Sequence, residues 1–213
     1  MTPPLLVIGG GGHGRVVIEA LLAAGAEVAG VIDPRPEVAA MLPDGVPWLG
    51  GDEALRRYRP EDYQLANGVG GIGDPQRRHV FERFSAAGYS FIRVRHPAAS
   101  VAQAGVALGE GCQIMAGAVI QPGASIGADV ILNTRAAVDH DCRIGDHSHI
   151  APGAVLCGDV MVGAGTHIGA GAVVIQGVRI GSSAIVGAGA VILRDVPDGV
   201  VVYSRDLRLE RPR

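Results

Sequence analysis

A six-residue repeat of large aliphatic side chains constrains this chain more than any other feature of its sequence. From Leu108 to Ile192, every sixth residue is Leu, Ile or Val, without an insertion. The residue four places after each aliphatic is small or slender, from Cys112 to Val196. Neither the helical period nor the alternation of a flat strand gives this spacing. An unbroken hexapeptide period is typical of a parallel β-helix, in which three hexads form one triangular coil.

The repeat also assigns roles to the residues between these columns. We expect the aliphatic side chains to point into the prism with the small residues packed beside them. Gly, Asp and Asn should turn the corners, because they tolerate positive φ. The alternative is an ordinary sheet protein rich in Gly, Ala and Val, which would have strands and turns of irregular length. A hydrophobic fraction of 48% with only 4% aromatic residues suits a core of stacked aliphatics.

The first 95 residues lack the repeat and instead alternate strands with helices. The residue pattern indicates strands at 5–8, 28–32, 63–66 and 89–94, and helices at 15–24 and about 75–87. Such alternation predicts a small Rossmann-like α/β domain with a mostly parallel sheet. His96-Pro97 marks the change of pattern, and no flexible linker follows it. We therefore expect an α/β domain at 1–95 packed against a β-helix domain at 96–213.

A glycine loop joins the first predicted strand to the first helix. The run Gly9-Gly10-Gly11-Gly12-His13-Gly14 contains GxGxxG, so its backbone can approach a phosphate at the N-terminus of the helix. Asp33 ends the next strand, where its carboxylate is placed to accept hydrogen bonds from a ribose or a base. We favour a nucleotide or nucleotide-sugar pocket that His13 faces. The alternatives are a tight turn without a ligand and an NAD site, and the short domain and His13 argue against the latter.

Composition and charge narrow the classes of function. The net charge of −3 gives no basic signature for nucleic acid or an anionic membrane. No apolar run approaches a membrane span, and the first residues lack a basic region before their short apolar run, so we expect a cytoplasmic protein. The cysteines form no CxxC pair, and we expect neither a disulfide framework nor a zinc knuckle.

Histidines interrupt the structural regularity of the predicted β-helix. His140 falls at or near a corner, between Asp139 and Asp141. An imidazole held by a carboxylate is the usual arrangement for a general base near neutral pH. The alternative is a solvated acidic corner.

A second histidine cluster follows, with His147, His149 and His167. The last two are 18 residues apart and should therefore stack in adjacent coils, roughly 5 Å apart by strand spacing. We favour contacts to a cofactor or substrate over plain surface histidines. A metal site is the least favoured alternative, since no ligand carboxylate stands out.

The chain resembles the sugar O-acyltransferase family of sialic acid O-acetyltransferases and bacterial nucleotide-sugar N-acetyltransferases, the group of PglD, NeuD and perosamine acetyltransferase. The resemblance covers nearly the whole sequence. It is carried by the glycine loop, by Gly71-Ile72-Gly73-Asp74, and most specifically by the run from Asn133-Thr134 through Val138-Asp139-His140-Asp141-Cys142 to His149-Ile150-Ala151-Pro152-Gly153. It implies a left-handed parallel β-helix that forms a homotrimer, with acetyl-CoA bound between neighbouring helices and no required metal. The hand comes from the resemblance, because left-handed crossovers are the exception.

The resemblance also implies roles residue by residue. His140 matches the general base, and Asp141 matches the acid that hydrogen-bonds to it. Matches to the acetyl-CoA site are His149, Gly158 and Ala170. Matches to the nucleotide-sugar site are Gly11, Gly12, His13, Asp33 and Gly73, with Asn133 near the acceptor. One departure lies at Val202-Tyr203-Ser204-Arg205-Asp206, which replaces a Gly-x-Pro-Ala-like turn near the expected CoA.

The expected reaction is direct transfer of an acetyl group from acetyl-CoA to the amine of a nucleotide-linked 4-amino-sugar. His140 would remove the proton, while backbone N–H groups steady the oxyanion. We do not expect Cys142 to carry the acyl group, because it belongs to the inward column. The alternatives are O-acetylation of sialic acid or another sugar hydroxyl, a β-helical zinc hydratase, and a non-catalytic nucleotide-sugar-binding protein.

Overall fold

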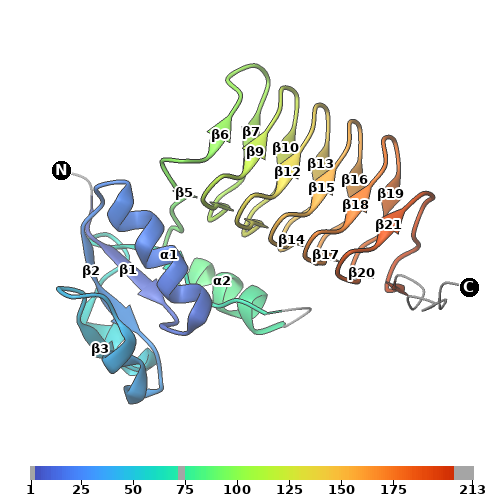
Figure 1. Ribbon diagram of the computed structural model, residues 1–213. Helices are drawn as coiled ribbons and strands as arrows, with labels where there is room; N and C mark the ends of the chain where they lie inside the picture. The colour runs from blue at the N-terminus through green and yellow to red at the C-terminus, as the bar shows by residue number, and fades with distance from the viewer. Residues whose placement is uncertain (1–2, 72–74, 204–213) are drawn as a thin grey trace, which may run out of the picture.

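A computed structural model describes residues 3–71 and 75–203, and it divides the chain into two parts that pack together (Figure 1). The N-terminal part is a parallel four-stranded sheet in the order β3-β2-β1-β4. Its elements are β1 (Leu5–Ile8), α1 (Gly12–Ala23), β2 (Val28–Ile32), the 3-10 helix η1 (Pro36–Met41), β3 (Trp48–Gly50), the 3-10 helix η2 (Asp52–Arg57), β4 (Gln64–Asn67) and α2 (Pro75–Ala86).

Most of the predicted N-terminal elements are confirmed, and one is wrong. The strands at 5–8 and 28–32 are present with the predicted bounds, whereas α1 begins at Gly12, inside the glycine loop. The single strand predicted at 89–94 does not form. Phe91 bridges to Leu65 of the N-terminal sheet, and β5 (Val94–Arg95) already pairs with the β-helix. Within this segment the chain passes from the N-terminal sheet to the β-helix, so one continuous strand cannot pair with both sheets.

The second part is a parallel β-helix built from short strands on three sheets. We name each face by its first strand. The β5 face holds β5, β8 (Gln113–Ile114), β11 (Ile131–Leu132), β14 (His149–Ile150), β17 (His167–Ile168), β20 (Ile185–Val186) and β22 (Val201–Val202). The β6 face holds β6 (Ser100–Val101), β9 (Val119–Ile120), β12 (Ala137–Val138), β15 (Val155–Leu156), β18 (Val173–Val174) and β21 (Val191–Ile192). The β7 face holds β7 (Ala107–Leu108), β10 (Ser125–Ile126), β13 (Arg143–Ile144), β16 (Met161–Val162) and β19 (Arg179–Ile180).

The coil geometry follows the hexapeptide register. Strands one coil apart pair residue for residue, as Ile131 does with His149 and His149 with His167. The aliphatic column and the small column together form the buried core of the prism. Every sixth residue from Gly105 to Gly189 has a positive φ. Most of these corner residues are glycines, and the others are Asp129, Arg135, Asp141, His147, Asp159 and Ser183. The prediction of Gly and Asp at the corners is thus confirmed, whereas Asn takes none of these positions.

A buried polar network joins the two parts. Arg77 of α2 forms an ion pair with Asp129 at a corner of the β-helix, with 2.9 Å between Nη1 and Oδ2. Asn67 donates to Oδ1 of Asp129 at 3.1 Å, and Nδ1 of His147 lies 3.0 Å from Oδ2 of the same aspartate. A buried ion pair is tolerated only when its remaining polar atoms are also satisfied. These bonds therefore fix the N-terminal part against the β-helix, while the boundary at residue 95 stays a prediction.

Within the described ranges, no helix is both long enough and apolar enough to cross a membrane.

Candidate active site

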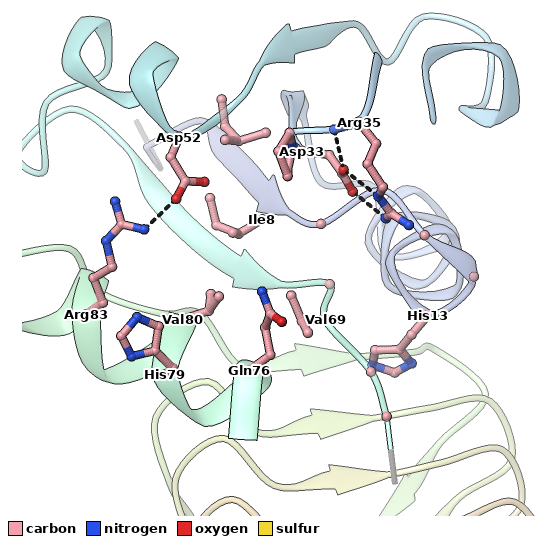
Figure 2. A pocket seen from close by; sticks show the side chains of 18 residues that line it. Ile8, His13, Asp33, Arg35, Asp52, Val69, Gln76, His79, Val80 and Arg83 are labelled. Atoms are coloured by element: carbon pink, nitrogen blue, oxygen red, sulfur yellow. Dashed lines mark hydrogen bonds and ion pairs between the residues drawn. The ribbon is translucent and has the colours of Figure 1, made fainter. Parts of the chain in front are cut away.

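A cavity of about 710 Å³ opens at the carboxyl ends of β1, β2 and β4 (Figure 2). Four of the residues predicted to bind the sugar nucleotide line it, namely Gly11, Gly12, His13 and Asp33. The carboxyl ends of parallel strands are the usual binding edge of open α/β sheets. The structure therefore brings these four residues together where a ligand is expected. Gly73, the fifth, lies outside the described residues.

The glycines of the loop have two different functions. A Cβ on Gly14 would lie 2.0 Å from the carbonyl oxygen of Gly9, so this position is required for close packing. A Cβ on Gly12 would meet nothing within 4 Å. Gly12 is the first residue of α1, where unpaired N–H groups and the helix dipole favour an anion. Its backbone therefore lies open to a ligand phosphate.

Asp33 is buried and fully hydrogen-bonded. Its carboxylate accepts the N–H of Gly10 at 2.8 Å and three bonds from Arg35, from the backbone N at 2.9 Å, Nε at 2.9 Å and Nη2 at 2.8 Å. Burial alone would raise the pKa of Asp33, but the bonds from Arg35 and Gly10 outweigh it and lower that pKa. In this structure Asp33 positions the loop and Arg35 rather than presenting a free oxygen to the cavity.

Arg35 is a cavity residue that the sequence did not reveal. Its side chain is 56% exposed while Asp33 orients it, and it lines the cavity beside the glycine loop. On another side of the cavity, Arg83 pairs with Asp52 (Figure 2). An arginine held in place by a carboxylate is well suited to bind phosphate oxygens. Arg35 follows Asp33 by two residues, so only the turn after β2 brings its guanidinium back to that carboxylate.

His13 connects the cavity to the β-helix. Its Nε2 lies 2.7 Å from Oε1 of Gln113 on β8, and Gln113 in turn donates to the carbonyl of Asn67 at 2.6 Å. Burial lowers the pKa of His13, which keeps the imidazole neutral near pH 7. The predicted orientation of His13 toward a ligand is compatible with this bond, because the residue also lines the cavity.

Asn133 and His149 come together on the β5 face. The amide of Asn133 lies 3.2 Å from Nε2 of His149, whose ring meets His167 edge-on with centroids 4.9 Å apart. The predicted stacking of these histidines is confirmed. Burial, with a smaller contribution from His167, lowers the pKa of His149 to about 3. His149 is therefore an uncharged group at physiological pH.

His140 and Asp141 form a pair at an exposed corner between the β6 and β7 faces. Nδ1 of His140 lies 2.9 Å from Oδ2 of Asp141. This bond raises the pKa of His140, and the charges of Asp139 and Asp159 add to the effect. The carboxylate thus orients the ring and leaves Nε2 free to take a proton, which is the geometry of a general base.

Two glycines make room for this pair. Gly158 is one coil beyond His140, and a Cβ there would lie 2.5 Å from both Cε1 and Nε2 of the ring. Gly123 is one coil before Asp141, and a Cβ there would lie 2.4 Å from its Oδ1. The imidazole therefore lies against the backbone of Gly158, one of the residues predicted for the acetyl-CoA site. Ala170, the other backbone position, is exposed at the corner between the β5 and β6 faces.

Within one chain, these residues form two separate groups. The N-terminal cavity and His149 lie at the β5 face, whereas His140 lies at the corner between the other two faces. In a triangular prism that corner is opposite the β5 face. A single chain therefore cannot bring His140 to the cavity.

The described residues contain no group of three or more His, Cys, Asp or Glu side chains arranged to hold a metal ion. Cys112 and Cys142 are buried as predicted, and Cys157 is partly buried. Burial raises the pKa of the Cys142 thiol to about 11.

Comparisons with known proteins agree with this architecture. Residues 4–84 match the PglD N-terminal domain, 98–122 the hexapeptide repeat of succinyl-transferase, and 159–194 the bacterial transferase hexapeptide (six repeats). The chain is 36% identical to the acetyltransferase domain of PglB from Neisseria gonorrhoeae FA1090, solved with acetyl coenzyme A, with a TM-score of 0.87 over 96% of this chain and 97% of that one. No curated protein sequence matches.

Two further solved structures resemble the chain. PerB from Caulobacter crescentus, in complex with CoA and GDP-perosamine, is 41% identical, with a TM-score of 0.86 over 96% of this chain and 95% of that one. WeeI from Acinetobacter baumannii AYE shares the fold, at 24% identity and a TM-score of 0.78 over 94% and 96% of the two chains. An α/β domain joined to a hexapeptide-repeat β-helix defines an acyltransferase. The chain belongs to the family of sugar acetyltransferases that includes PglB and PerB.

Proposed function

We propose that this enzyme transfers the acetyl group of acetyl-CoA to the amine of a nucleotide-linked 4-amino-sugar. The observation that carries the proposal is the cavity at the N-terminus of α1, where Gly12 and Arg35 offer N–H groups and positive charge to a diphosphate. His13 joins this cavity directly to the β-helix. Among relatives, PglB has been solved with acetyl coenzyme A and PerB with CoA and GDP-perosamine.

An apolar stripe on the β6 face supports a homotrimer with shared active sites. The first residue of each strand points away from the core, and on this face these residues are Ser100 in β6, followed by Val119, Ala137, Val155, Val173 and Val191. Val191 is 60% exposed in the single chain. A row of five outward aliphatics, uninterrupted from β9 to β21, is typical of an interface that is covered in the assembly.

The symmetry of such a trimer completes the site. The corner that holds His140 and the corner that holds Asn133 border the β6 face on its two sides. In a trimer whose β6 faces point toward a common three-fold axis, the His140 corner of each subunit lies beside the Asn133 corner of its neighbour. His140 of one subunit would then lie near Asn133 and His149 of the next. Acetyl-CoA would bind in the groove between Gly158 of the first subunit and Ala170 of the second.

In this arrangement the chemistry is a direct transfer. The neutral amine attacks the thioester carbonyl, Nε2 of His140 takes its proton, and the collapse of the tetrahedral intermediate expels the CoA thiolate. The N–H of Gly158 makes no backbone hydrogen bond within the described part of the chain and lies beside the ring, where it can donate to the oxyanion. An acyl-enzyme on Cys142 is disfavoured, because its thiol is buried and has a raised pKa.

The proposal is tested by thiol release from acetyl-CoA in the presence of GDP- and UDP-linked 4-amino-sugars. We expect release that depends on the amino-sugar, and a product whose acetyl group resists mild alkali, as an amide does. An alkali-labile product would instead identify O-acetylation of a hydroxyl. Absence of thiol release with every amino-sugar nucleotide would contradict the proposal.

A further inference from the structure

Arg135 occupies a corner position that otherwise holds glycine. From Gly117 to Gly189, the residue with positive φ at the corner between the β5 and β6 faces is glycine in every coil but one. The exception is Arg135, which has a φ of 57°. Residues with a Cβ rarely adopt this conformation, and those that do gather at functional positions. The turn does not require a side chain, so the arginine is explained by what its guanidinium reaches.

The Arg135 side chain is exposed and has no acidic partner in its own chain. None of the ion pairs among the described residues includes it. Its stem leans toward the preceding coil, where a Cβ on Gly117 would lie 3.1 Å from Cγ of Arg135. The side chain therefore follows one edge of the apolar β6 face and leaves its charge free for a group outside the single chain.

Asp141 has the same arrangement at the other edge of the β6 face. It also has a positive φ, and its carboxylate also leans toward the preceding coil, where it lies over Gly123. Oδ2 of Asp141 bonds to Nδ1 of His140, whereas Oδ1 accepts no hydrogen bond from the described residues. An ionised carboxylate accepts through both of its oxygens. Oδ1 is therefore open to a donor from outside the chain.

The proposed trimer sets these two edges side by side in neighbouring subunits. Rotation about a three-fold axis leaves the height of every residue along that axis unchanged. Arg135 and Asp141 are six residues apart, which is a third of a coil. With the β-helix aligned along the axis and coils spaced roughly 4.8 Å apart, the two residues differ in height by only about 1.6 Å. Both side chains also lean the same way, so they face each other across the boundary between subunits.

We propose that Arg135 of each subunit forms an ion pair with Oδ1 of Asp141 in the next subunit and so holds the Asp141–His140 pair in position. A guanidinium suits this task, because its planar array of N–H groups binds a carboxylate in a fixed geometry. Arg135 is then a positioning residue, which acts through Asp141 and does not touch the reacting atoms. This inference rests on the proposed function and on its shared site.

The ion pair also changes the charge around the base. The bond from Asp141 raises the pKa of His140, and the charges of Asp139 and Asp159 add to the effect. A cation from the neighbouring subunit opposes these three carboxylates. Removal of Arg135 should therefore raise the pKa of His140 further. Because the base acts only when it is neutral, the acidic limb of kcat/KM should then move to higher pH, opposite to the direction expected for Asp141→Asn.

The first test compares pH profiles of kcat/KM for thiol release with a nucleotide-linked amino-sugar. Arg135→Gly should fold as a trimer, since glycine holds this position in the other coils, and its acidic limb should move up by about 0.2–0.7 of a pH unit, the effect of one exposed charge pair. Arg135→Lys keeps the charge and should keep the limb near its wild-type position. Arg179→Ala is the control, because it removes an exposed arginine from the β7 face.

Mixed trimers show which subunit supplies the arginine. Arg135→Gly is refolded with an excess of His140→Ala, and trimers that contain both variants are isolated through a different affinity tag on each. Most sites with His140 then have Gly at position 135 in their own subunit and Arg135 in both neighbours, so the limb should return to its wild-type position. The matched control uses the double variant His140→Ala/Arg135→Gly as the excess partner, and there the limb should stay displaced.

Three results would overturn the inference. One is an acidic limb that does not move in Arg135→Gly. Another is a limb that stays displaced in the mixed trimers with His140→Ala, because the arginine would then act within its own subunit. The third is a higher KM for the nucleotide sugar as the only effect, which would make Arg135 a substrate contact. All three are measured on enzyme whose wild type releases thiol, so they differ from failure of the proposed function, in which no amino-sugar nucleotide supports release.

Discussion

Asp141 raises the pKa of the His140 imidazole and orients its ring. Asp141 has a positive φ of 60°, a conformation that most side chains avoid, and its carboxylate bonds to the adjacent ring. A non-glycine residue held in this region often marks a functional position. The sequence predicted both residues and their pairing. It could not predict Arg35, because the bond from Arg35 to Asp33 depends on the turn that follows β2.

The first prediction concerns the pH dependence of catalysis. A general base acts only when it is neutral, so kcat/KM should fall as the pH drops below the pKa of His140, which Asp141 raises. Asp141→Asn removes that effect, so the acidic limb of the profile should move to lower pH while the plateau decreases. His140→Ala should lower kcat by about 10²–10⁴-fold and regain part of the rate at high pH. An acidic limb that stays in place in Asp141→Asn would contradict this role.

The second prediction concerns the glycine beneath the ring. Gly158→Ala places a methyl group 2.5 Å from Nε2 of His140, so the imidazole must move. Since Gly158 does not have a positive φ, alanine should fit the backbone without strain. We expect a lower kcat with a nearly unchanged melting temperature. In the His140→Ala background the same substitution should have little further effect on kcat, and two fully additive effects would contradict the steric explanation.

At the scale of elements, the prediction was best where the sequence of a strand or helix has a clear hydrophobic pattern. The hexapeptide column specified the β-helix strands, and the fully apolar β1 was found with its bounds. The short β3 and the 3-10 helix η2 were missed, because Trp48–Gly50 and Asp52–Arg57 have neither a clear period nor strong propensity. Both elements depend on tertiary contacts. The strand β3 pairs with β2, and Asp52 of η2 forms an ion pair with Arg83 of α2.

The third prediction concerns the start of α1. Gly12→Leu should fold normally, because the position is open and helical, but its side chain should occupy the phosphate end of the cavity. We expect a higher KM for the nucleotide sugar, an unchanged KM for acetyl-CoA and an unchanged melting temperature. Gly14→Ala is the contrasting variant, because its Cβ would lie 2.0 Å from the carbonyl oxygen of Gly9, so it should lower stability. If the two variants changed the KM for the nucleotide sugar and the melting temperature in the same way, the loop would have only a structural role.

For the whole molecule, the arrangement of the two parts separates the N-terminal cavity from His140 within one chain. The network of Arg77, Asp129 and His147 fixes the N-terminal cavity to the β5 face, while His140 lies at the corner opposite that face. None of these distances could be read from the sequence, because they depend on how the N-terminal part docks on the β-helix. The positions of His140 and the aliphatic row of the β6 face together support the proposal that a second subunit completes each site.

The last prediction tests this sharing by subunit complementation. His140→Ala removes the base but keeps an intact nucleotide cavity, whereas Gly12→Leu blocks the cavity but keeps the base. Thiol release is assayed at a nucleotide-sugar concentration far below the raised KM of Gly12→Leu, so that each variant alone releases little thiol. When the two variants are unfolded and refolded together, a mixed trimer contains sites that take His140 from one subunit and the cavity from its neighbour. Random mixing in equal amounts should restore about one quarter of the sites in a cyclic trimer, measured as thiol release. The variants refolded separately and then combined serve as the control. If co-refolding restores no activity although mixed trimers form, the cavity and His140 of the same subunit must act together, and the shared site would be wrong.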